Sequence, residues 1–341
     1  MEFVTLGKTG IVANKNGFGA LPIQRISKTE AVNLVLRAFR GGFNFFDTAR
    51  FYTDSEEKLG AAFAGMRDQV VIASKTMALT PEDFRKDLET TLRNLQTDYL
   101  DLYQFHNPAF CPKPGDGTGL YEEMLAAKAA GKIRHIGITN HRLSVAQEAV
   151  QSGLYETLQF PFCQLSTAVD QELVDLCCRK EVGFIAMKAL SGGLLNDAEA
   201  AYAFQAQFPH VLPIWGIQRE RELDEFLVFM SSPPRMTKEI AERIEKDRRE
   251  IGGSFCRSCG YCMPCPVGIQ IHNCARMSWN LRRMPSQNWL NDEWRTEMER
   301  TRQCLHCGQC IRRCPYHLNV PEVLDENYRD YQAILKGETQ V

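Results

Sequence analysis

The sequence has no hydrophobic run long enough to cross a membrane. Its longest apolar runs, such as residues 70–73 and 211–214, have the length of a β-strand, whereas a membrane-spanning helix needs about 20 apolar residues. Residues 1–10 also lack a charged start followed by an apolar stretch, so we recognise no secretory signal. The formal net charge is only -2, and no overall charge therefore favours nucleic acid or a membrane surface. These absences predict a cytoplasmic protein with neither a nucleic-acid nor a membrane partner.

Cysteine, in contrast, is abundant, because 13 of the 341 residues are cysteines. Eight of them form two tight groups in the C-terminal part, and the other five are scattered along the chain. A reducing compartment keeps thiols free, so the clustered thiols predict a metal centre rather than a disulfide framework. Among the scattered ones, Cys163, Cys177 and Cys178 are expected to pack as small hydrophobic residues.

Both cysteine groups have the spacing of iron–sulfur ligands, and each ends in Cys-Pro. In two-cluster ferredoxins, three closely spaced thiolates hold one [4Fe–4S] cluster and the cysteine before the proline ligates the other. The rule gives Cys256, Cys259, Cys262 and Cys314 for one cluster, and Cys304, Cys307, Cys310 and Cys265 for the other. The first group has one residue fewer before its last cysteine than the second, so the pairing stays open. Two zinc sites are the alternative, although zinc usually takes cysteines from separated pairs.

Strand and helix signals alternate regularly between residue 16 and about residue 230. Short apolar runs predict strands at 17–20, 43–47, 70–74, 100–106, 133–139, 157–160, 183–187 and 211–214. The segments between them predict helices at 28–40, 55–63, 81–95, 118–130, 144–151, 170–180, 198–208 and 220–230. This alternation predicts a parallel sheet. Eight units favour a (β/α)8 TIM barrel, with an open doubly wound sheet as the competing fold.

The two ends of the chain have other patterns. Residues 3–5 and 11–13 flank a Gly-Lys-Thr-Gly turn and predict a small hairpin at the bottom of the barrel. Residues 237–251 predict a charged helix, and the stretch between the cysteine groups also has a helical pattern. We therefore expect a barrel domain over residues 1–235, followed by a small, mainly α-helical, ferredoxin-like iron–sulfur domain over residues 236–341.

Four ionisable residues fall at the predicted carboxyl ends of strands or just beyond them: Asp47, Tyr52, Lys75 and His106. In a barrel these ends converge on the face where active sites lie. A nearby ammonium stabilises a tyrosinate, so Lys75 beside Asp47 is expected to lower the pKa of Tyr52. Tyr52 can then pass a proton to a carbonyl oxygen as a hydride reaches the carbon, and His106 can hydrogen-bond the same oxygen. Each residue alone suits a structural role, and it is the set of four that predicts this chemistry.

Longer motifs around these residues resemble the aldo-keto reductase family. The matching segments are F-D-T-A-x-x-Y-x-x-S-E at 46–56, I-A-S-K at 72–75, Y-L-D-L-Y-Q-x-H at 99–106 and G-I-T-N at 137–140. They follow the family's order, and the resemblance covers residues 1–230. The fusion to C-G-Y-C-M-P-C-P at 259–266 resembles an iron–sulfur branch of the family. The resemblance implies a TIM barrel in which Asp47, Tyr52, Lys75 and His106 form the catalytic tetrad.

The resemblance also implies a nicotinamide cofactor and its contacts. Three polar residues match those that hold the nicotinamide carboxamide. A methionine stands where most members have a tyrosine that stacks on the ring, and a thioether can still pack there. A glycine-containing loop matches the one that passes over the pyrophosphate. The carboxamide residues are Thr139, Asn140 and Gln159, the methionine is Met187, and the loop residues are Leu190, Gly192 and Gly193.

The adenosine end of the expected cofactor site departs from the family pattern. The NADP-binding members carry a lysine and then an arginine for the 2′-phosphate, where this chain has Gly216 and Glu222. An acidic residue suits a ribose 2′-OH better than a 2′-phosphate, which favours NAD(H) over NADP(H). Arg219 and Arg221 are close enough in sequence to bind a phosphate instead. Glu225 matches the family's adenine contact.

The sequence therefore predicts a nicotinamide-dependent oxidoreductase that interconverts a small carbonyl compound and an alcohol. Nicotinamide transfers two electrons as a hydride, whereas a [4Fe–4S] cluster accepts one. The two clusters are therefore expected to be structural, to sense oxygen or redox state, or to relay electrons with a ferredoxin-type partner. No flavin motif is present, although barrels can bind flavin without one. The alternative is an iron–sulfur electron-transfer protein whose barrel is a docking or flavin-binding scaffold. The substrate and the oligomeric state are not specified by the sequence.

Overall fold

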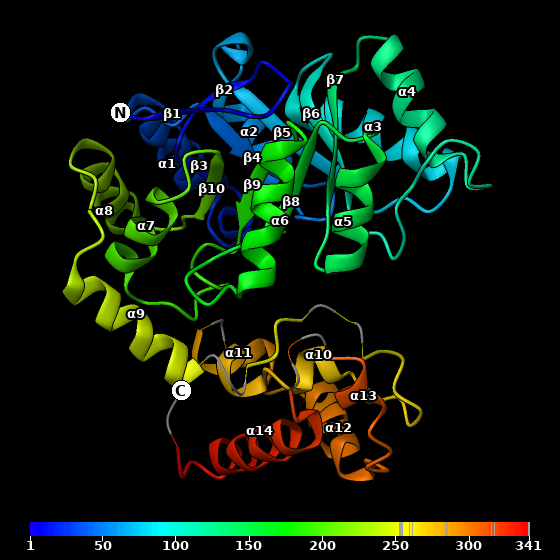
Figure 1. Ribbon diagram of the computed structural model, residues 1–341, viewed down its shortest axis with the longest axis vertical. Helices are drawn as coiled ribbons and strands as arrows, with labels where there is room; N and C mark the ends of the chain where they lie inside the picture. The colour runs from blue at the N-terminus through cyan, green and yellow to red at the C-terminus, as the bar shows by residue number, and fades with distance from the viewer. Residues whose placement is uncertain are drawn as a thin grey trace. The chain divides into compact units, whose positions relative to one another are not determined.

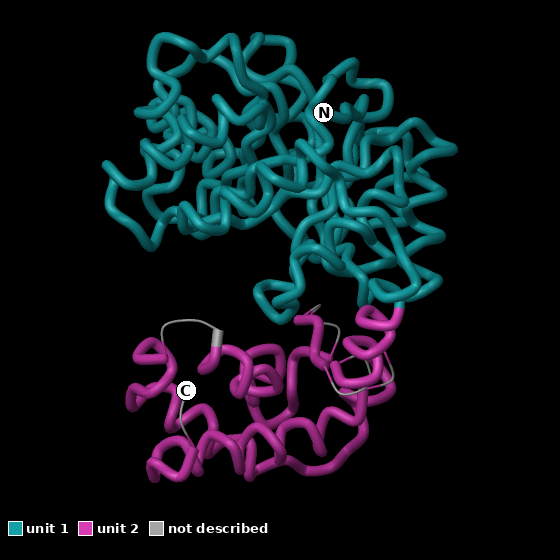
Figure 2. The backbone as a smooth tube through the Cα atoms, turned by 90° about the vertical axis from the view of Figure 1, so that its left-hand side faces the viewer, with its two compact units in different colours: residues 1–241 teal, residues 242–341 magenta. Residues whose placement is uncertain are grey.

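The computed structural model describes residues 1–251, 255–258, 260, 262–283, 286–314, 316 and 318–339. The chain forms two compact units, Met1–Ala241 and Glu242–Val341, which Figure 2 draws in different colours. Within the described stretches, no helix is long and apolar enough to span a membrane. The predicted domain boundary after residue 235 lies shortly before this division and stays a prediction.

The first unit is built around a closed barrel of parallel strands (Figure 1). The strands pair in the order β10-β3-β4-β5-β6-β7-β8-β9, and each pairs in parallel with both neighbours. The predicted TIM barrel is confirmed, and the open doubly wound sheet is wrong. The strands are β3 (Gly17–Gly19), β4 (Phe45–Asp47), β5 (Val71–Thr76), β6 (Leu100–His106), β7 (Ile133–Thr139), β8 (Thr157–Pro161), β9 (Gly183–Met187) and β10 (Val211–Gly216).

An α-helix follows each barrel strand along the chain. Local sequence sets where these helices begin: the Ser27 hydroxyl accepts from the Glu30 backbone N–H at 3.2 Å, and the Glu30 carboxylate accepts from the Ser27 N–H at 2.9 Å. This reciprocal cap satisfies two N–H groups that a helix start leaves unpaired. The helices are α1 (Lys28–Arg40), α2 (Ser55–Ala62), α3 (Pro81–Leu95), α4 (Leu120–Ala129), α5 (Leu143–Ser152), α6 (Ala168–Arg179), α7 (Ala198–Ala206) and α8 (Glu220–Ser231), with short 3-10 helices η1 (Pro22–Arg25) and η2 (Arg67–Gln69).

The predicted hairpin closes the end of the barrel opposite the carboxyl ends of its strands. Strand β1 (Phe3–Thr5) pairs antiparallel with β2 (Val12–Asn14). Val4 and Leu6 pack in one buried cluster with barrel residues such as Phe45. The Lys8 backbone N–H donates to the carbonyl of Glu181, just before β9. The opposite end is therefore the one left for a functional site.

The second unit is mainly helical, as predicted, and its described residues contain no β-strand. The longest of its helices are α9 and α14, and α9 begins before the unit does. The helices are α9 (Lys238–Ile251), α10 (Ile271–Cys274), α11 (Met277–Arg283), α12 (Asp292–Arg300), α13 (Gln309–Arg312) and α14 (Val320–Leu335), with 3-10 helices η3 (Ser286–Asn288) and η4 (Thr301–Gln303).

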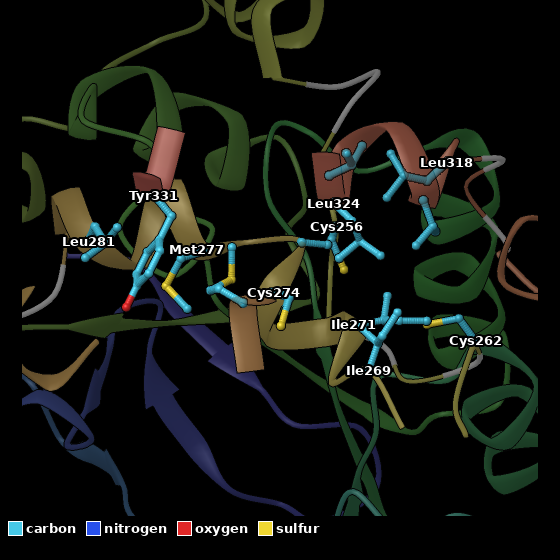
Figure 3. Packing of buried hydrophobic residues seen from close by; sticks show 14 of the residues in the cluster. Cys256, Cys262, Ile269, Ile271, Cys274, Met277, Leu281, Leu318, Leu324 and Tyr331 are labelled. Atoms are coloured by element: carbon cyan, nitrogen blue, oxygen red, sulfur yellow. The ribbon is translucent and has the colours of Figure 1, made fainter. Parts of the chain in front are cut away.

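Cysteines take part in the apolar core of this unit. Figure 3 shows side chains from α10, α11 and α14, among them Met277 and Tyr331, gathered with Cys256 and Cys262. Trp289 and Trp294 lie against this core, with ring centroids 4.7 Å apart. Since the unit is small, a group bound to Cys256 and Cys262 would form part of its core.

Candidate active site and cysteine cavities

The structure brings the four predicted polar residues together at the carboxyl end of the barrel. Asp47 is the last residue of β4, Lys75 lies near the end of β5, and His106 is the last residue of β6. These three strands are neighbours in the barrel. Tyr52 lies in the loop between β4 and α2. The side chains thus come from one edge of the barrel, where loop residues of such folds do chemistry.

An ion pair forms the floor of this site. The Lys75 Nζ lies 2.7 Å from Asp47 Oδ2, and it also donates to the Thr48 carbonyl at 2.6 Å. Both side chains are almost fully buried, at 1% and 3% exposed. Asp47 Oδ2 also accepts from Gln159 Nε2 at 3.4 Å. The ammonium is therefore held by two acceptors, and Gln159 helps to fix one of them, the Asp47 carboxylate.

Tyr52 and His106 lie above this pair. Lys75 Nζ is 5.1 Å from the centroid of the Tyr52 ring. The Tyr52 and His106 rings are 5.8 Å apart and nearly perpendicular, at 83°. Within the described residues, Asp47 Oδ1 and His106 Nδ1 are buried without a hydrogen-bond partner. Unsatisfied buried polar atoms are rare, so these two atoms indicate that the site is built for a polar ligand.

The pKa shifts support one expectation and correct another. Burial, together with the Lys75 charge, lowers the pKa of His106 to about 3, so its imidazole is neutral at physiological pH. The predicted lowering of the Tyr52 pKa is wrong for the structure as it stands. Burial raises the pKa of Tyr52, and the opposing effect of Lys75 is smaller. The phenol is therefore protonated near neutral pH and is ready to donate a proton.

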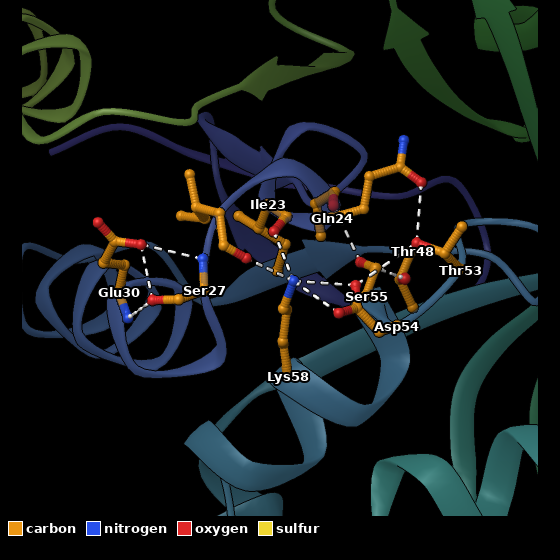
Figure 4. A network of polar contacts seen from close by, with 11 residues as sticks. Ile23, Gln24, Ser27, Glu30, Thr48, Thr53, Asp54, Ser55 and Lys58 are labelled. Carbon is orange, nitrogen blue, oxygen red and sulfur yellow. Dashed lines mark hydrogen bonds and ion pairs between the residues drawn. The ribbon is translucent and has the colours of Figure 1, made fainter.

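Buried polar contacts fix the loop that carries Tyr52 (Figure 4). The Thr48 hydroxyl donates to Ser55 Oγ at 2.9 Å, across the two ends of the loop. Just beyond it, the buried Lys58 ammonium donates to the Ile23 carbonyl at 3.0 Å and to Asp54 at 2.9 Å. These contacts tie the loop to the segment after β3, so the position of the phenol does not depend on a free loop.

Sequence reasoning gave no role to Glu56, which the structure buries completely. Its carboxylate forms an ion pair with Arg50 and accepts from Ser74 Oγ and Thr91 Oγ1, each at 2.8 Å. Asn94 Nδ2 donates to it at 3.2 Å. Because Ser74 directly precedes Lys75, this network joins the Tyr52 loop to the strand that carries the ammonium.

Gln104 is a second residue that sequence reasoning missed. Its Nε2 donates to Gln159 Oε1 at 2.9 Å, and Gln159 in turn reaches Asp47. Gln104 Oε1 is buried without a partner among the described residues. Gln104 and His106 are two residues apart on β6, so their side chains lie on the same face of the strand. The alternation of side chains along β6 could therefore have identified Gln104 as a neighbour of His106.

The predicted nicotinamide contacts lie at the ends of the next strands. Thr139 ends β7, and its hydroxyl accepts from the Asn107 backbone N–H at 3.0 Å. Asn140 follows it: its Nδ2 donates to the Pro108 carbonyl at 2.9 Å, and its Oδ1 accepts from the backbone N–H of Arg142 at 2.7 Å. An amide nitrogen carries two hydrogens, so a further contact with a carboxamide is compatible with these bonds.

The loop after β9 is shaped for a close approach by a ligand. Met187 ends this strand and is half-buried. Ser191, Gly192 and Gly193 all have positive φ, at 52°, 70° and 89°. The backbone N–H of Gly193 donates to the Leu190 carbonyl at 2.9 Å. A side chain at Gly193 would meet open space, but its left-handed backbone favours glycine.

At the expected adenosine end, Glu222 has a structural role that the sequence did not reveal. Its carboxylate accepts from the backbone N–H groups of Gln218 at 2.8 Å and Arg219 at 3.0 Å, which caps α8. Burial and the nearby carboxylates of Asp197 and Glu222 raise the pKa of Glu225. The acidic side chains of Asp197, Glu222 and Glu225 therefore lie close to one another.

An open cavity of about 420 Å³ lies beside the Tyr52 loop. Its walls come from the loops after β4 and β5 and from α3. They include the exposed apolar side chains of Phe51, Met77 and Leu79, together with Arg50 and Lys86. The cavity gives a partly apolar approach to the carboxyl end of the barrel.

Two further cavities, both in the second unit, are lined by cysteines. One cavity is lined by Cys262, Cys265, Cys304, Cys307 and Cys310. The other is lined by Cys256, Cys262 and Cys314. Cys262 lines both cavities, so the crosswise pairing stays a prediction. Cys259 lies outside the described residues.

The cavities suit iron–sulfur clusters. Thiols are the donors that hold such clusters, and apolar side chains of Ile269, Ile271 and Leu324 complete the walls of the first cavity. Over the described ranges, no three His, Cys, Asp or Glu side chains converge as a single metal ion requires.

The remaining cysteines have no such arrangement. Cys111, Cys163, Cys177 and Cys274 are buried, and burial raises the pKa of Cys274 to about 12, so its thiol stays protonated. Cys178 was expected to be packed, and this is wrong because it is exposed. Consecutive helix residues point about 100° apart, so α6 can bury Cys177 while it exposes its neighbour.

Comparison with known families agrees with both parts of the chain. The model of the aldo/keto reductase family matches residues 15–225, and the model of a 4Fe-4S dicluster domain matches residues 255–319. The resemblance predicted from the motifs is confirmed, and so is the order of the two parts.

Two curated relatives illustrate the similarity of the barrel. L-galactose dehydrogenase from Arabidopsis thaliana is 31% identical over 222 residues, which cover 58% of this chain and 68% of that protein. NADH-specific methylglyoxal reductase from Escherichia coli strain K12 is 27% identical over 229 residues, which cover 58% of this chain and 69% of that protein.

Solved structures share the fold. An aldo-keto reductase from Klebsiella pneumoniae in complex with NADPH superposes with a TM-score of 0.62 at 23% identity, covering 72% of this chain and 94% of that one. An aldo-keto reductase from Bacillus halodurans, in its holo form, gives a TM-score of 0.63 at 20% identity over 72% and 96%. At this identity the comparison concerns the fold alone.

Proposed function

Because this chain belongs to the aldo/keto reductase family and continues into a 4Fe-4S dicluster domain, we propose that it reduces a small carbonyl compound to an alcohol with a nicotinamide cofactor. The observation that carries the proposal is the convergence of Asp47, Tyr52, Lys75 and His106 at the carboxyl end of the barrel. When bound, dihydronicotinamide supplies the hydride. The chain's own residues supply the proton and the electrostatic environment.

Tyr52 is the proposed general acid. Its raised pKa keeps the phenol protonated, so it can donate its proton to the carbonyl oxygen as negative charge develops there. Lys75, held by Asp47 at 2.7 Å, stabilises the resulting tyrosinate. Neutral His106 hydrogen-bonds the same oxygen and orients the carbonyl group. In the oxidative direction the same groups act in reverse.

The proposed acid predicts a specific pH profile. Tyr52, whose pKa lies above its usual value of about 10, stays protonated below that pH. His106 stays neutral above about pH 3. We therefore expect kcat/KM for carbonyl reduction to be flat from about pH 5 to about pH 9 and to fall above about pH 10. A steady-state profile with a transition near pH 6.5 would contradict the assignment of His106 as a neutral donor.

We propose NADH as the preferred cofactor. Support comes from three acidic side chains. Asp197 and Glu222 lie close enough to Glu225 to raise its pKa, and the three carboxylates together would repel a 2′-phosphate. The relative from Escherichia coli is described as NADH-specific and as acting on methylglyoxal, which makes methylglyoxal a suitable first substrate for this chain.

The test is a steady-state comparison of NADH and NADPH with methylglyoxal, using anaerobically purified protein. Repulsion of roughly 1 kcal/mol per nearby charge predicts that Glu225→Gln lowers the NADH to NADPH ratio of kcat/KM by roughly fivefold. Glu220→Gln, on the same exposed helix start, is the matched control and should leave the ratio unchanged. A wild-type preference for NADPH would contradict the cofactor proposal. If neither nicotinamide bound, the scaffold alternative would replace the whole proposal.

A further inference from the structure

One of the two cysteine cavities reaches the surface of the protein. Cys256, which lines only the cavity that includes Cys314, is 9% exposed, whereas Cys307, which lines only the cavity that includes Cys265, is exposed. Two large apolar side chains flank the exposed thiol: Leu305 is 66% exposed and Ile311 is 38% exposed. A purely structural cluster gains nothing from an exposed ligand between exposed apolar residues, because both features favour contact with another molecule.

The same surface is positively charged. From residue 300 to residue 321 the chain carries four arginines and no aspartate or glutamate. The arginines Arg302, Arg312 and Arg313 are exposed. Arg302 forms an ion pair with Asp325 at 3.0 Å, so the positive charge of the surface rests on Arg312 and Arg313. We name the surface formed by residues 302–313 the arginine edge. Its positive charge repels a basic protein and attracts an acidic one.

Arg312 is held in place at this edge. Its Nη1 donates to the Cys307 carbonyl at 3.2 Å. It also lies 3.0 Å from the position that a Cβ on Gly308 would occupy, and Gly308 has a φ of +71°. The absence of a side chain at Gly308 therefore lets a guanidinium lie directly beside the exposed ligand loop, at a position that a partner would meet first.

We propose that the arginine edge is the docking surface for an acidic one-electron carrier protein. Brief electron-transfer complexes have small interfaces, and complementary charge raises their association rate more than their affinity. An apolar centre at Leu305 and Ile311 with a cationic surround has this character. In the step, the reduced carrier loses one electron and the cluster held by Cys265, Cys304, Cys307 and Cys310 gains one, with no bond or proton transferred.

The inference rests on the dicluster domain and not on carbonyl chemistry. It can fail while NADH-dependent reduction of a carbonyl compound persists, and the reverse also holds. Its test therefore uses the reduction of the clusters as its readout, and no carbonyl substrate is present.

The probe is a reduced plant-type [2Fe–2S] ferredoxin, an acidic carrier with a low reduction potential. Stopped-flow absorbance follows cluster reduction in the anaerobic full-length protein. We expect the wild-type rate to fall steeply with salt, because screening weakens charge steering. Arg312→Glu with Arg313→Glu should slow the ferredoxin reaction at least tenfold at low salt, within the roughly 10–1,000-fold range of electrostatic steering.

The matched control is the pair Arg249→Glu and Arg295→Glu, two exposed arginines on α9 and α12, which should leave the rate unchanged. Reduced methyl viologen, a small donor that needs no docking surface, should react equally with all the proteins and so shows that the clusters are intact. Anisotropy of labelled, oxidised ferredoxin gives a second readout that is independent of cluster potential. Equal ferredoxin rates in the two double variants, or ferredoxin binding that does not weaken with salt, would overturn the proposal.

Discussion

Replacing Tyr52 with Phe is expected to lower kcat for carbonyl reduction by about 10²–10⁴-fold, the range over which general acid catalysis contributes. The change removes only the hydroxyl that donates the proton, while the ring stays against His106, 5.8 Å away between centroids. Lys75 and Asp47 keep their ion pair. We therefore expect NADH binding, measured by fluorescence titration, to be nearly unchanged.

The matched control is Tyr121→Phe. The Tyr121 hydroxyl donates to the Leu154 carbonyl at 2.6 Å, far along the chain from the proposed site. Loss of that hydrogen bond should cost about 1 kcal/mol of stability and leave kcat unchanged. If Tyr52→Phe kept full turnover, Tyr52 would not be the acid and the proposed mechanism would have to be abandoned.

Replacing one cluster ligand is expected to have the largest effect on the second unit. Two intact clusters carry about eight iron atoms per chain, and Cys304→Ala should lower this to about four. Because Cys265, Cys304 and Cys310 pack against the apolar core, loss of the cluster that they are proposed to bind also removes material from that core. Binding energy of such groups is largely folding energy, so protease sensitivity of residues 242–341 should rise.

Paired variants test the crosswise ligation. If Cys265 serves the cluster of the second group, then Cys265→Ala and Cys304→Ala should lose the same electron paramagnetic resonance signal, and Cys314→Ala should lose the other. Cys274→Ala is the control, because that buried thiol lines neither cavity, and it should keep the full iron content. Loss of the same signal in Cys265→Ala and Cys314→Ala would contradict the pairing.

The barrel could be predicted closely because its strands are buried apolar runs between clear helix boundaries. The bounds of β6, β7 and β9 agree with the sequence prediction at both ends. The short helices of the second unit were predicted only as a helical stretch, because four-residue elements such as α10 and α13 are shorter than any hydrophobic period.

The site was predictable in its residues and less so in its electrostatics. The sequence places a lysine near Tyr52, but only the structure shows that burial outweighs its charge and raises the pKa of the phenol. Glu56 escaped notice because a glutamate at a helix start is usually solvated. Its buried setting depends on Gly60, one turn later, where a Cβ would lie only 2.3 Å from the Asn94 carbonyl oxygen. Such close packing between α2 and α3 arises from the tertiary structure and is not encoded in a local sequence pattern.

The most direct test of the central claim is the fate of the hydride. Protein supplied with methylglyoxal and NADH deuterated at the transferred C4 position should form an alcohol that carries deuterium on the former carbonyl carbon, as measured by mass spectrometry. Direct transfer in a closed site gives one deuterium per product molecule. Product without deuterium, its label lost to water, would mean that the electrons pass through a flavin or the clusters, and would contradict the proposed hydride transfer beside Tyr52.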